Sequence, residues 1–182
     1  MSVLLGLGNA TGMFYHAPAG TALPTYPSEQ LAAAWKEVGL VGDAGLVISS
    51  SKSTTNIKNW ANQIARVIMT DHSETAKAPI IDTSEEALKA VLGAGNVTTT
   101  AASGEHGKLI TASLSNGALP PEEAFLFLMK DGDNEMMVGC TNGQIMAMDD
   151  ITFAPGSAIT WNPTITALGD GFKFIVDNGQ TS

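Results

Sequence analysis

Tight-turn signals divide the second half of the sequence into short apolar runs. Asn or Asp precedes Gly at 116–117, 131–132, 142–143 and 178–179, and a Pro-Gly pair occupies 155–156. Asn-Gly and Asp-Gly readily supply the positive φ angles that tight β-hairpins need. The runs between them have the length of strands, which predicts consecutive antiparallel strands packed as a sandwich or barrel. These runs are 108–114, 123–130, 135–140, 144–153, 157–168 and 172–177.

Two of these runs indicate how their strands are buried. In 157–168, Trp161 and Ile165 alternate with polar residues, so one face is buried and the other faces water or a polar interface. Pro163 lies in the same run and requires an edge strand or a bulge, because it lacks the backbone N–H. Residues 124–129 are apolar on both faces, which predicts a central strand covered on both sides.

The clearest helix signal follows Asp82. Thr83 and Glu86 have capping-box spacing, Leu88 begins an apolar stripe, and Gly93 ends the pattern. These features predict one short helix over about 84–92. Its apolar stripe must pack against the sheet.

The first half of the chain has weaker signals. Residues 1–27 are rich in Gly, Pro and Ala and predict an extended N-terminal arm. Ser28 is in position to cap a short helix over 29–38, in which Leu31 and Trp35 share a face.

A polar segment follows these elements. The run 44–50 predicts a strand, and 63–70 and 73–82 predict two more strands joined at a turn near Asp71. Between them, residues 49–60 contain many Ser, Thr and Asn and little bulk, which predicts a long polar loop.

Length and cysteine content bound the organisation of the chain. A chain of 182 residues is long enough for one domain that buries roughly 70% of its unfolded surface. We therefore expect a single domain with the arm 1–27, a β-sandwich core 28–177 and a tail 178–182. The lone Cys140 cannot form an internal disulfide, and the sequence shows neither an export signal nor a membrane-length apolar run.

The charge balance limits the classes of function that we expect for the chain. The chain carries a formal charge of -9, and only 15% of its residues are charged. Proteins that bind nucleic acid tightly present basic patches, so attraction to phosphate is not expected to be the main activity. The low charged fraction suggests that partners cover part of the surface.

Candidate catalytic groups do not assemble into a site. Ser49 and Lys52 match the S-x-x-K pattern of serine acyl-enzymes, but that pattern needs a helix and this segment favours extended chain. The stretch from Asp71 to Glu74 contains triad residue types, yet neighbours on a turn cannot align as nucleophile, base and orienting group. Cys140 is interpreted as a small buried apolar residue. We predict no enzymatic activity.

Binding motifs for small ligands are also incomplete. Residues 6–12 resemble a phosphate loop without its strand and helix, and 131–142 lack the Gly and Glu of a calcium loop. His16, His72 and His106 have no ligand spacing. No cofactor or metal is predicted.

Several segments, in their order, resemble one known family. They are "TGMFYHAPAGTALPT", "VGLVGDAGL", a polar segment ending at Trp60, "EEALKAVLGAGNVT" and "NGQIMAMDDITFAPGSAITWNPTITAL". Together they are similar to the major tail proteins of long-tailed, non-contractile bacteriophages, from about residue 10 to residue 177. The resemblance implies a β-sandwich or barrel of the tail-tube type with one flanking helix. It also implies rings, usually hexameric, that stack into a tube through which DNA is ejected.

The resemblance and the polar composition together suggest assembly contacts. In such tubes long loops and terminal arms join successive rings, so the polar loop is the candidate for a contact between rings. Its residues are Ser49, Ser50, Ser51, Lys52, Ser53, Thr54, Thr55, Asn56, Lys58 and Trp60. The candidates for contacts of the arm are Phe14, Tyr15, Pro18, Leu23 and Pro24.

Partners and location follow from the same resemblance. We expect a homo-oligomeric ring, a tape-measure protein, and tail-terminator or tail-tip proteins, in the virion and in the host cytoplasm during assembly, without a membrane. DNA is expected to pass an acidic or neutral lumen without specific binding, because carboxylates repel phosphate over about 8 Å. Three alternatives remain open: a monomeric β-sandwich binding module, an inner-tube subunit of a contractile tail or secretion system, and a hydrolase using Ser49 and Lys52.

Overall fold

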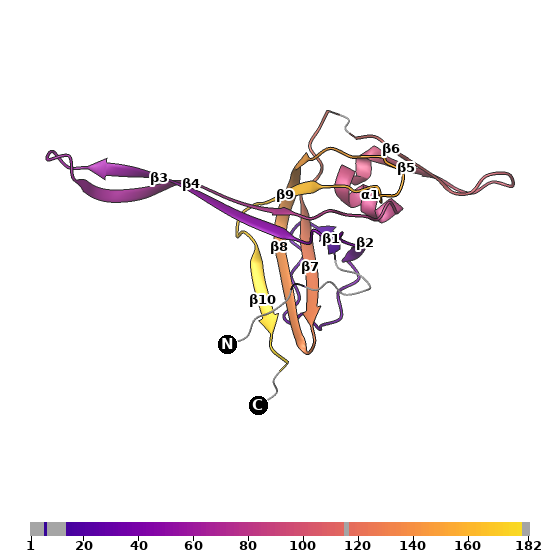
Figure 1. The fold of residues 1–182 in the computed structure, drawn as a ribbon, viewed down its shortest axis with the longest axis horizontal. Coiled ribbons are helices and arrows are strands. Elements are labelled where there is room, and N and C mark those ends of the chain that lie inside the picture. The colour runs from indigo at the N-terminus through magenta and orange to yellow at the C-terminus, as the bar shows by residue number, and fades with distance from the viewer. Residues whose placement is uncertain (1–5, 7–13, 115–116, 180–182) are drawn as a thin grey trace.

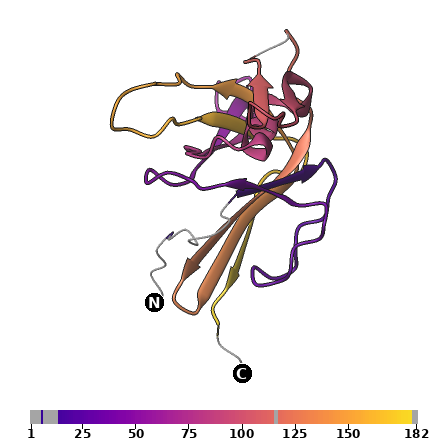
Figure 2. The same ribbon diagram turned by 90° about the vertical axis from the view of Figure 1, so that its right-hand side faces the viewer.

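A computed structural model describes residues 6, 14–114 and 117–179, and these are mostly antiparallel β-sheet with one short α-helix (Figures 1 and 2). This confirms the predicted mainly-β fold. The elements in chain order are β1 (Phe14–Pro18), β2 (Lys36–Gly39), β3 (Val47–Lys58), β4 (Ile64–Lys77), α1 (Glu85–Leu92), a 3-10 turn η1 (Ala94–Asn96), β5 (Val97–Thr100), β6 (Leu109–Ala112), β7 (Glu123–Asp131), β8 (Asn134–Met148), β9 (Pro163–Ala167) and β10 (Lys173–Asp177).

One sheet organises most of the strands. Its order is β2-β1-β7-β8-β9-β4-β3, with β10 also paired to β8. Strand β8 pairs with β7 on one edge, and its other edge is shared by β10 in the first part and β9 in the second. Among the described residues the sheet does not close into a barrel.

The larger core lies between this sheet and α1. Ala87, Val91 and Leu92 of α1 pack in one buried cluster with sheet residues such as Phe125 and Phe127. In the same cluster the ring of Phe14 stacks on that of Phe127, with centroids 4.4 Å apart and planes 6° from parallel. Stacked aromatic pairs of this kind add stability beyond the area that they bury.

The opposite face of β7 is covered by an irregular segment, residues 19–35. Its Leu31 and Trp35 pack with Ala124, Leu126 and Met137 in a second cluster. Strand β7 lies between β1 and β8 and is buried on both faces, as the apolar run 124–129 predicts. The covering segment belongs to the same chain.

Helix α1 has caps at both ends. The Oγ of Ser84 accepts a hydrogen bond from the Ala87 N–H at 3.2 Å, so Ser84 is the N-cap and not its neighbour Thr83. Gly93 ends the helix with a φ of 87°, which a residue with a side chain rarely adopts. The predicted range of about 84–92 is confirmed.

The predicted helix over 29–38 is wrong. Residues 19–35 contain neither helix nor strand, and β2 begins at Lys36. The Ala-rich sequence has helical propensity, but Leu31 and Trp35 gain more by lying flat against the sheet. Propensity is worth only fractions of a kcal/mol per residue, so burial of these side chains decides.

The predicted turn at Asn142 and Gly143 is also wrong, because β8 continues through both residues. A Cβ at Gly143 would lie 2.9 Å from the Cys140 Sγ and 3.1 Å from the Phe125 ring. Glycine is therefore needed at this position for space in a strand, not for a turn. The turn at 131–132 is confirmed, since β7 and β8 join there.

The run 157–168 forms a strand only in its second part, β9. Trp161 makes an isolated bridge to Ile80, and Pro163 is the first residue of β9, opposite Met148. Proline is tolerated at the first residue of a strand. The alternation of burial is confirmed, since Trp161 and Ile165 are buried and their neighbours are half-buried.

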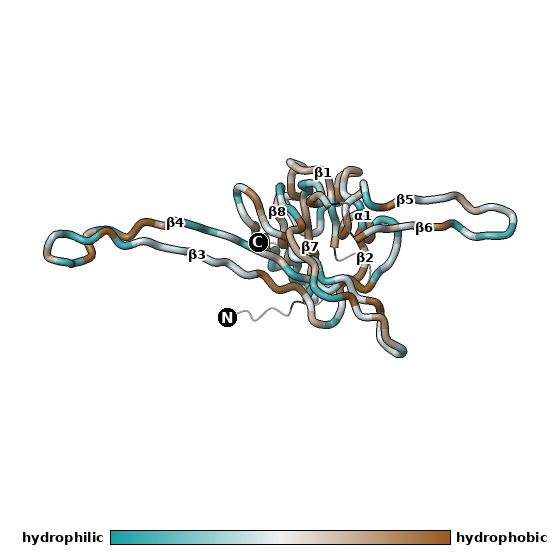
Figure 3. The backbone as a smooth tube through the Cα atoms, turned by 90° about the horizontal axis from the view of Figure 1, so that it is seen from above, coloured by the Kyte–Doolittle hydropathy of each residue, from teal (hydrophilic) through white to brown (hydrophobic). Residues whose placement is uncertain are grey.

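Two predictions about the first half need correction. The polar loop 49–60 is a strand as far as residue 58, and Asp71 lies inside β4 instead of at a turn. The resulting β3–β4 hairpin and the shorter β5–β6 hairpin project from the body in opposite directions (Figures 1 and 3).

The predicted arm 1–27 is only partly an arm. Residues 1–5 and 7–13 lie outside the described part of the chain, as do Asn116 and 180–182. Residues 14–18 form β1, which is held between β2 and β7. Phe14, His16 and Ala17 are buried, which explains why this segment joins the sheet.

Candidate self-assembly surface

The candidate contact residues lie on the β3–β4 hairpin, which we call the long hairpin (residues 47–77). Every residue from 49 to 72 is exposed. Nine of the ten candidates lie on β3, and Trp60 lies in the turn at the tip, where it is fully exposed. At about 3.3 Å per residue, β3 alone spans about 40 Å. The structure therefore brings the ten candidates together along one exposed element.

The tip of the long hairpin is closed by a specific turn. The Asn59 N–H donates to the Gln63 carbonyl at 2.8 Å, and the Gln63 N–H donates to the Asn59 Oδ1 at 2.9 Å. Asn62 adopts a φ of 62°, a left-handed conformation that Asn tolerates better than most residues. The turn holds Trp60 at the outermost end.

The outer half of the long hairpin is unusually apolar for exposed structure. Val67 and Met69 lie opposite Asn56 and Thr54, so all four side chains share a face, and the two apolar ones are 56% and 58% exposed. Ile57 and Ile64 are also exposed large apolar residues near the tip. Exposed apolar clusters on soluble proteins commonly mark interaction sites.

Apart from Thr75–Lys77, the strand edges of the long hairpin also lack partners among the described strands. Strand β4 pairs with β9 only through Thr75–Lys77, so residues 64–74 pair only with β3 among the described strands. The other edge of β3 pairs with no described strand. Two-stranded hairpins are marginally stable alone, and open edges invite pairing with another chain. Both properties fit a surface that becomes covered.

Residues 47–70, which make up most of the long hairpin, differ in charge from the rest of the chain. Residues 47–70 contain Lys52, Lys58 and Arg66 and no acidic residue. This segment therefore carries +3, and the remaining residues carry -12 of the total -9. None of its three cations forms an ion pair within the described residues.

The possible catalytic groups are not arranged for catalysis. Ser49 and Lys52 are three residues apart on a strand, so their side chains point to opposite faces. Ser50 Oγ lies 3.4 Å from His72 Nε2, but Glu74 contacts the same nitrogen at 3.2 Å. A triad needs the base to use one nitrogen for the nucleophile and the other for the orienting carboxylate.

Cys140 is buried in the main core, as predicted. Burial raises the pKa of its thiol to about 11, so the thiol stays protonated near neutral pH. Groups of three or more His, Cys, Asp and Glu with the geometry of a metal site do not occur among the described residues.

The candidate contacts of the arm lie in different environments. Phe14 is 1% exposed and belongs to the core, so its ring has no surface to offer a partner. Tyr15 and Leu23 pack with the second cluster, and Pro24 is half-buried. Pro18 is exposed at the end of β1. Of these five, Pro18 alone is exposed.

Sequence reasoning missed two groups of residues. Arg66, Val67 and Met69 were predicted to lie in a separate strand. Their run has few charges, and they pair with residues 54–57 to complete the exposed surface of the long hairpin. His16 is buried beside Glu123, with 2.8 Å between Nδ1 and the carboxylate, at a separation of 107 residues that no local pattern reveals.

A family comparison agrees with this architecture. Residues 7–175 match the family described as phage tail tube protein, which is most of the chain and includes every helix and nearly every strand residue described above. The chain belongs to the phage tail tube protein family. No curated protein matches the chain.

Membership of the phage tail tube family identifies a structural component of the virion tail, which implies assembly with other tail subunits. The described helix is too short to cross a bilayer, and no other helix in that part of the chain has the length and apolar character to do so.

Proposed function

We propose that this tail tube protein self-assembles into stacked rings, and that the stacked rings form the conduit through which DNA is ejected. The observation that carries the proposal is the long hairpin, with its apolar tip and unpaired strand edges standing away from the body. A monomer gains nothing from such an element, whereas a repeated head-to-tail contact would cover it in every copy.

Strand edges elsewhere support ring closure. The outer edge of β10 has no partner among the described strands, and β2 is the first strand of the sheet. Pairing such edges between neighbours would extend the sheet from one copy to the next. We propose that the ring is a hexamer and that it assembles in the host cytoplasm with tape-measure and tail-terminator or tail-tip proteins.

The acidic balance supports passage of DNA without trapping. The residues outside 47–70 carry -12, and carboxylates repel phosphate over about one Debye length, about 8 Å at physiological salt. We propose a lumen that is acidic or neutral. A tube structure with the nine basic residues gathered on the lumen wall would contradict this.

A binding module has less support. A carbohydrate platform needs several exposed aromatic rings together, but Tyr26, Trp60, Phe153 and Phe174 lie on four different segments. Only Trp60 lies on the long hairpin.

The test is electron microscopy of the purified protein at rising concentration. We expect rings and tubes, and class averages with six-fold symmetry. The variant Ser51→Pro with Lys52→Glu removes a donor from the β3 backbone and reverses a charge, so tubes should fail while the body stays folded. The matched control is Ser51→Thr with Lys52→Arg, which should form tubes. A wild-type protein that remains monomeric at all concentrations would overturn the proposal.

A further inference from the structure

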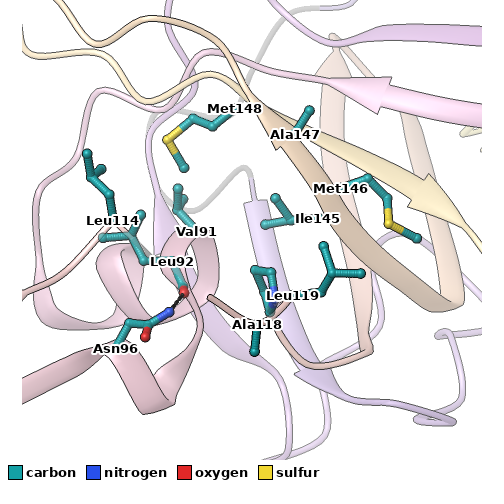
Figure 4. A pocket seen from close by; sticks show the side chains of 11 residues that line it. Val91, Leu92, Asn96, Leu114, Ala118, Leu119, Ile145, Met146, Ala147 and Met148 are labelled. Carbon is teal, nitrogen blue, oxygen red and sulfur yellow. Dashed lines mark hydrogen bonds between the residues drawn. The ribbon is translucent and has the colours of Figure 1, made fainter. Parts of the chain in front are cut away.

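An apolar groove lies beside the end of α1, on the body of the protein (Figure 4). It consists of two adjoining hollows of about 180 and 370 Å³, and Leu114 and Met148 line both. Leu119 and Met146 line the first hollow, and Phe153 lines the second. The walls come from α1, from β8, from the segment before β7 and from the segment after β8.

The groove exposes large apolar side chains. Leu119 and Phe153 are 60% and 70% exposed, and Leu114 and Met146 are also exposed. The two methionines give the groove flexible walls that adapt to an inserted side chain. An apolar surface of this kind on a subunit of an assembly is expected to be covered.

One end of the groove is acidic. Asp149 and Asp150 line the second hollow together with Phe153. Asp149 contacts Lys77 at 3.3 Å in an exposed ion pair, whereas Asp150 has no ion pair within the described residues. The groove therefore combines apolar walls with a carboxylate that is free for a cation from elsewhere.

The long hairpin has the complementary properties. Five of the nine basic residues form ion pairs within the chain, and three of the other four are Lys52, Lys58 and Arg66. Lys58 and Arg66 flank the turn that carries the exposed Trp60. The tip thus presents a large apolar ring between two cations, and the groove presents apolar walls next to carboxylates.

A hairpin cannot reach the groove of its own chain. The long hairpin joins the rest of the sheet through Thr75–Lys77 and extends away from the body in two perpendicular views, with the tip far from α1 (Figures 1 and 3). The complementary surfaces must therefore meet between copies, as a head-to-tail contact that repeats along an assembly.

We propose that the tip of the long hairpin of one copy, with Trp60, docks into the apolar groove of another copy, and that Lys58 and Arg66 lie against its acidic end. This inference rests on the proposed function, because it supplies the receptor for a contact between tube subunits. The buried aromatic ring gives the affinity, and the charges give the orientation and speed of docking.

Charge reversal tests the pairing directly. One variant carries Lys58→Glu and Arg66→Glu, a second carries Asp149→Lys and Asp150→Lys, and a third carries all four changes. All four residues are exposed, so circular dichroism and thermal melting should show native folding. Analytical ultracentrifugation and microscopy then measure the concentration at which each variant stacks.

We expect each charge-reversed pair to raise that concentration by about 10-fold or more, and the four-residue variant to return close to the wild type. Trp60→Ala should raise it by about 30-fold or more, as loss of a central aromatic contact does. The control Tyr26→Ala, an exposed aromatic outside both surfaces, should change nothing. A four-residue variant no better than either pair would overturn the proposal.

Disulfide trapping separates this proposal from the proposed function. A chain with Trp60→Cys is mixed with a chain with Leu119→Cys, and the control partner carries Leu109→Cys on the β5–β6 hairpin. Native Cys140 is buried and does not interfere. We expect a crosslink with position 119 and none with 109. If tubes form but this crosslink does not, the docking proposal is overturned and the proposed tube function stands. If the crosslink forms but wild-type protein gives no tubes, the proposed tube function is overturned and the docking proposal stands.

Discussion

Replacing Phe14 by alanine tests whether this residue serves the core or an assembly arm. Its ring is 1% exposed and lies on Phe127 at 4.4 Å and near Phe125 at 6.1 Å. Truncation of a buried Phe to Ala costs about 3–5 kcal/mol, because apolar contact is lost and a cavity remains. That is a large part of the roughly 5–15 kcal/mol that stabilises a typical domain.

The assays are unfolding in urea and unfolding by heat, each followed by circular dichroism below the concentration at which the protein assembles. At about 2–4 °C per kcal/mol for a chain of this size, the melting temperature should fall by about 8–16 °C for a loss of about 4 kcal/mol. A double-mutant cycle with Phe127→Ala should show a coupling of about 0.5–1.5 kcal/mol from ring stacking. The control Tyr26→Ala should stay within about 0.5 kcal/mol of the wild type.

One result would refute this reasoning. If Phe14→Ala kept wild-type stability but lost the ability to assemble, the ring would be available to a partner in solution. Phe14 would then act as the predicted arm contact, and the packing of β1 between β2 and β7 would not represent the free subunit.

Three further predictions concern local chemistry. Ser84→Ala removes the N-cap of α1 and should cost about 1 kcal/mol in urea unfolding, whereas Ser84→Asp should restore it. Hydrogen bonds from Lys108 and then Lys89 lower the pKa of Glu85 to about 2. This contribution to stability is present above pH 4.5 and is lost as the pH falls toward 2, so the stability gap between wild type and Glu85→Gln should narrow over that window. Since burial raises the pKa of Cys140 to about 11, iodoacetamide at neutral pH should label it only in denaturant, and labelling of the native protein would contradict the packing of β8.

The parts of the fold that could be predicted are those determined by residues close together in the sequence. The stop of α1 at Gly93 and the turn at Gly132 both use positive φ angles, which few other residues adopt. The central position of β7 follows from its apolar residues on both faces. These features need no knowledge of distant contacts.

The long hairpin was not predictable as a strand for a physical reason. A strand is recognised in sequence when one face packs on a core and the side chains alternate. Residues 49–58 pack on nothing, so Ser, Thr and Asn occupy both faces and leave no period of two. The run was predicted to be a polar loop, which is wrong as far as residue 58, because its extended pairing with β4 depends on a partner strand.

The groove was unpredictable because its walls come together only in the fold. Leu119, Met146 and Phe153 belong to three segments, and in the sequence each is interpreted as an ordinary apolar residue. The same applies to the cover over β7, where Trp35 packs without the helix that its neighbours favour.

The placement of the three tryptophans has a spectroscopic consequence. Trp35 and Trp161 are buried in the two clusters, whereas Trp60 at the tip of the long hairpin is fully exposed. Fluorescence from the first two is insensitive to the solvent around the folded subunit, so a shift in emission on mixing arises from Trp60. The intact protein thus contains its own optical probe at the tip, and the rate of docking can be followed in real time without a dye.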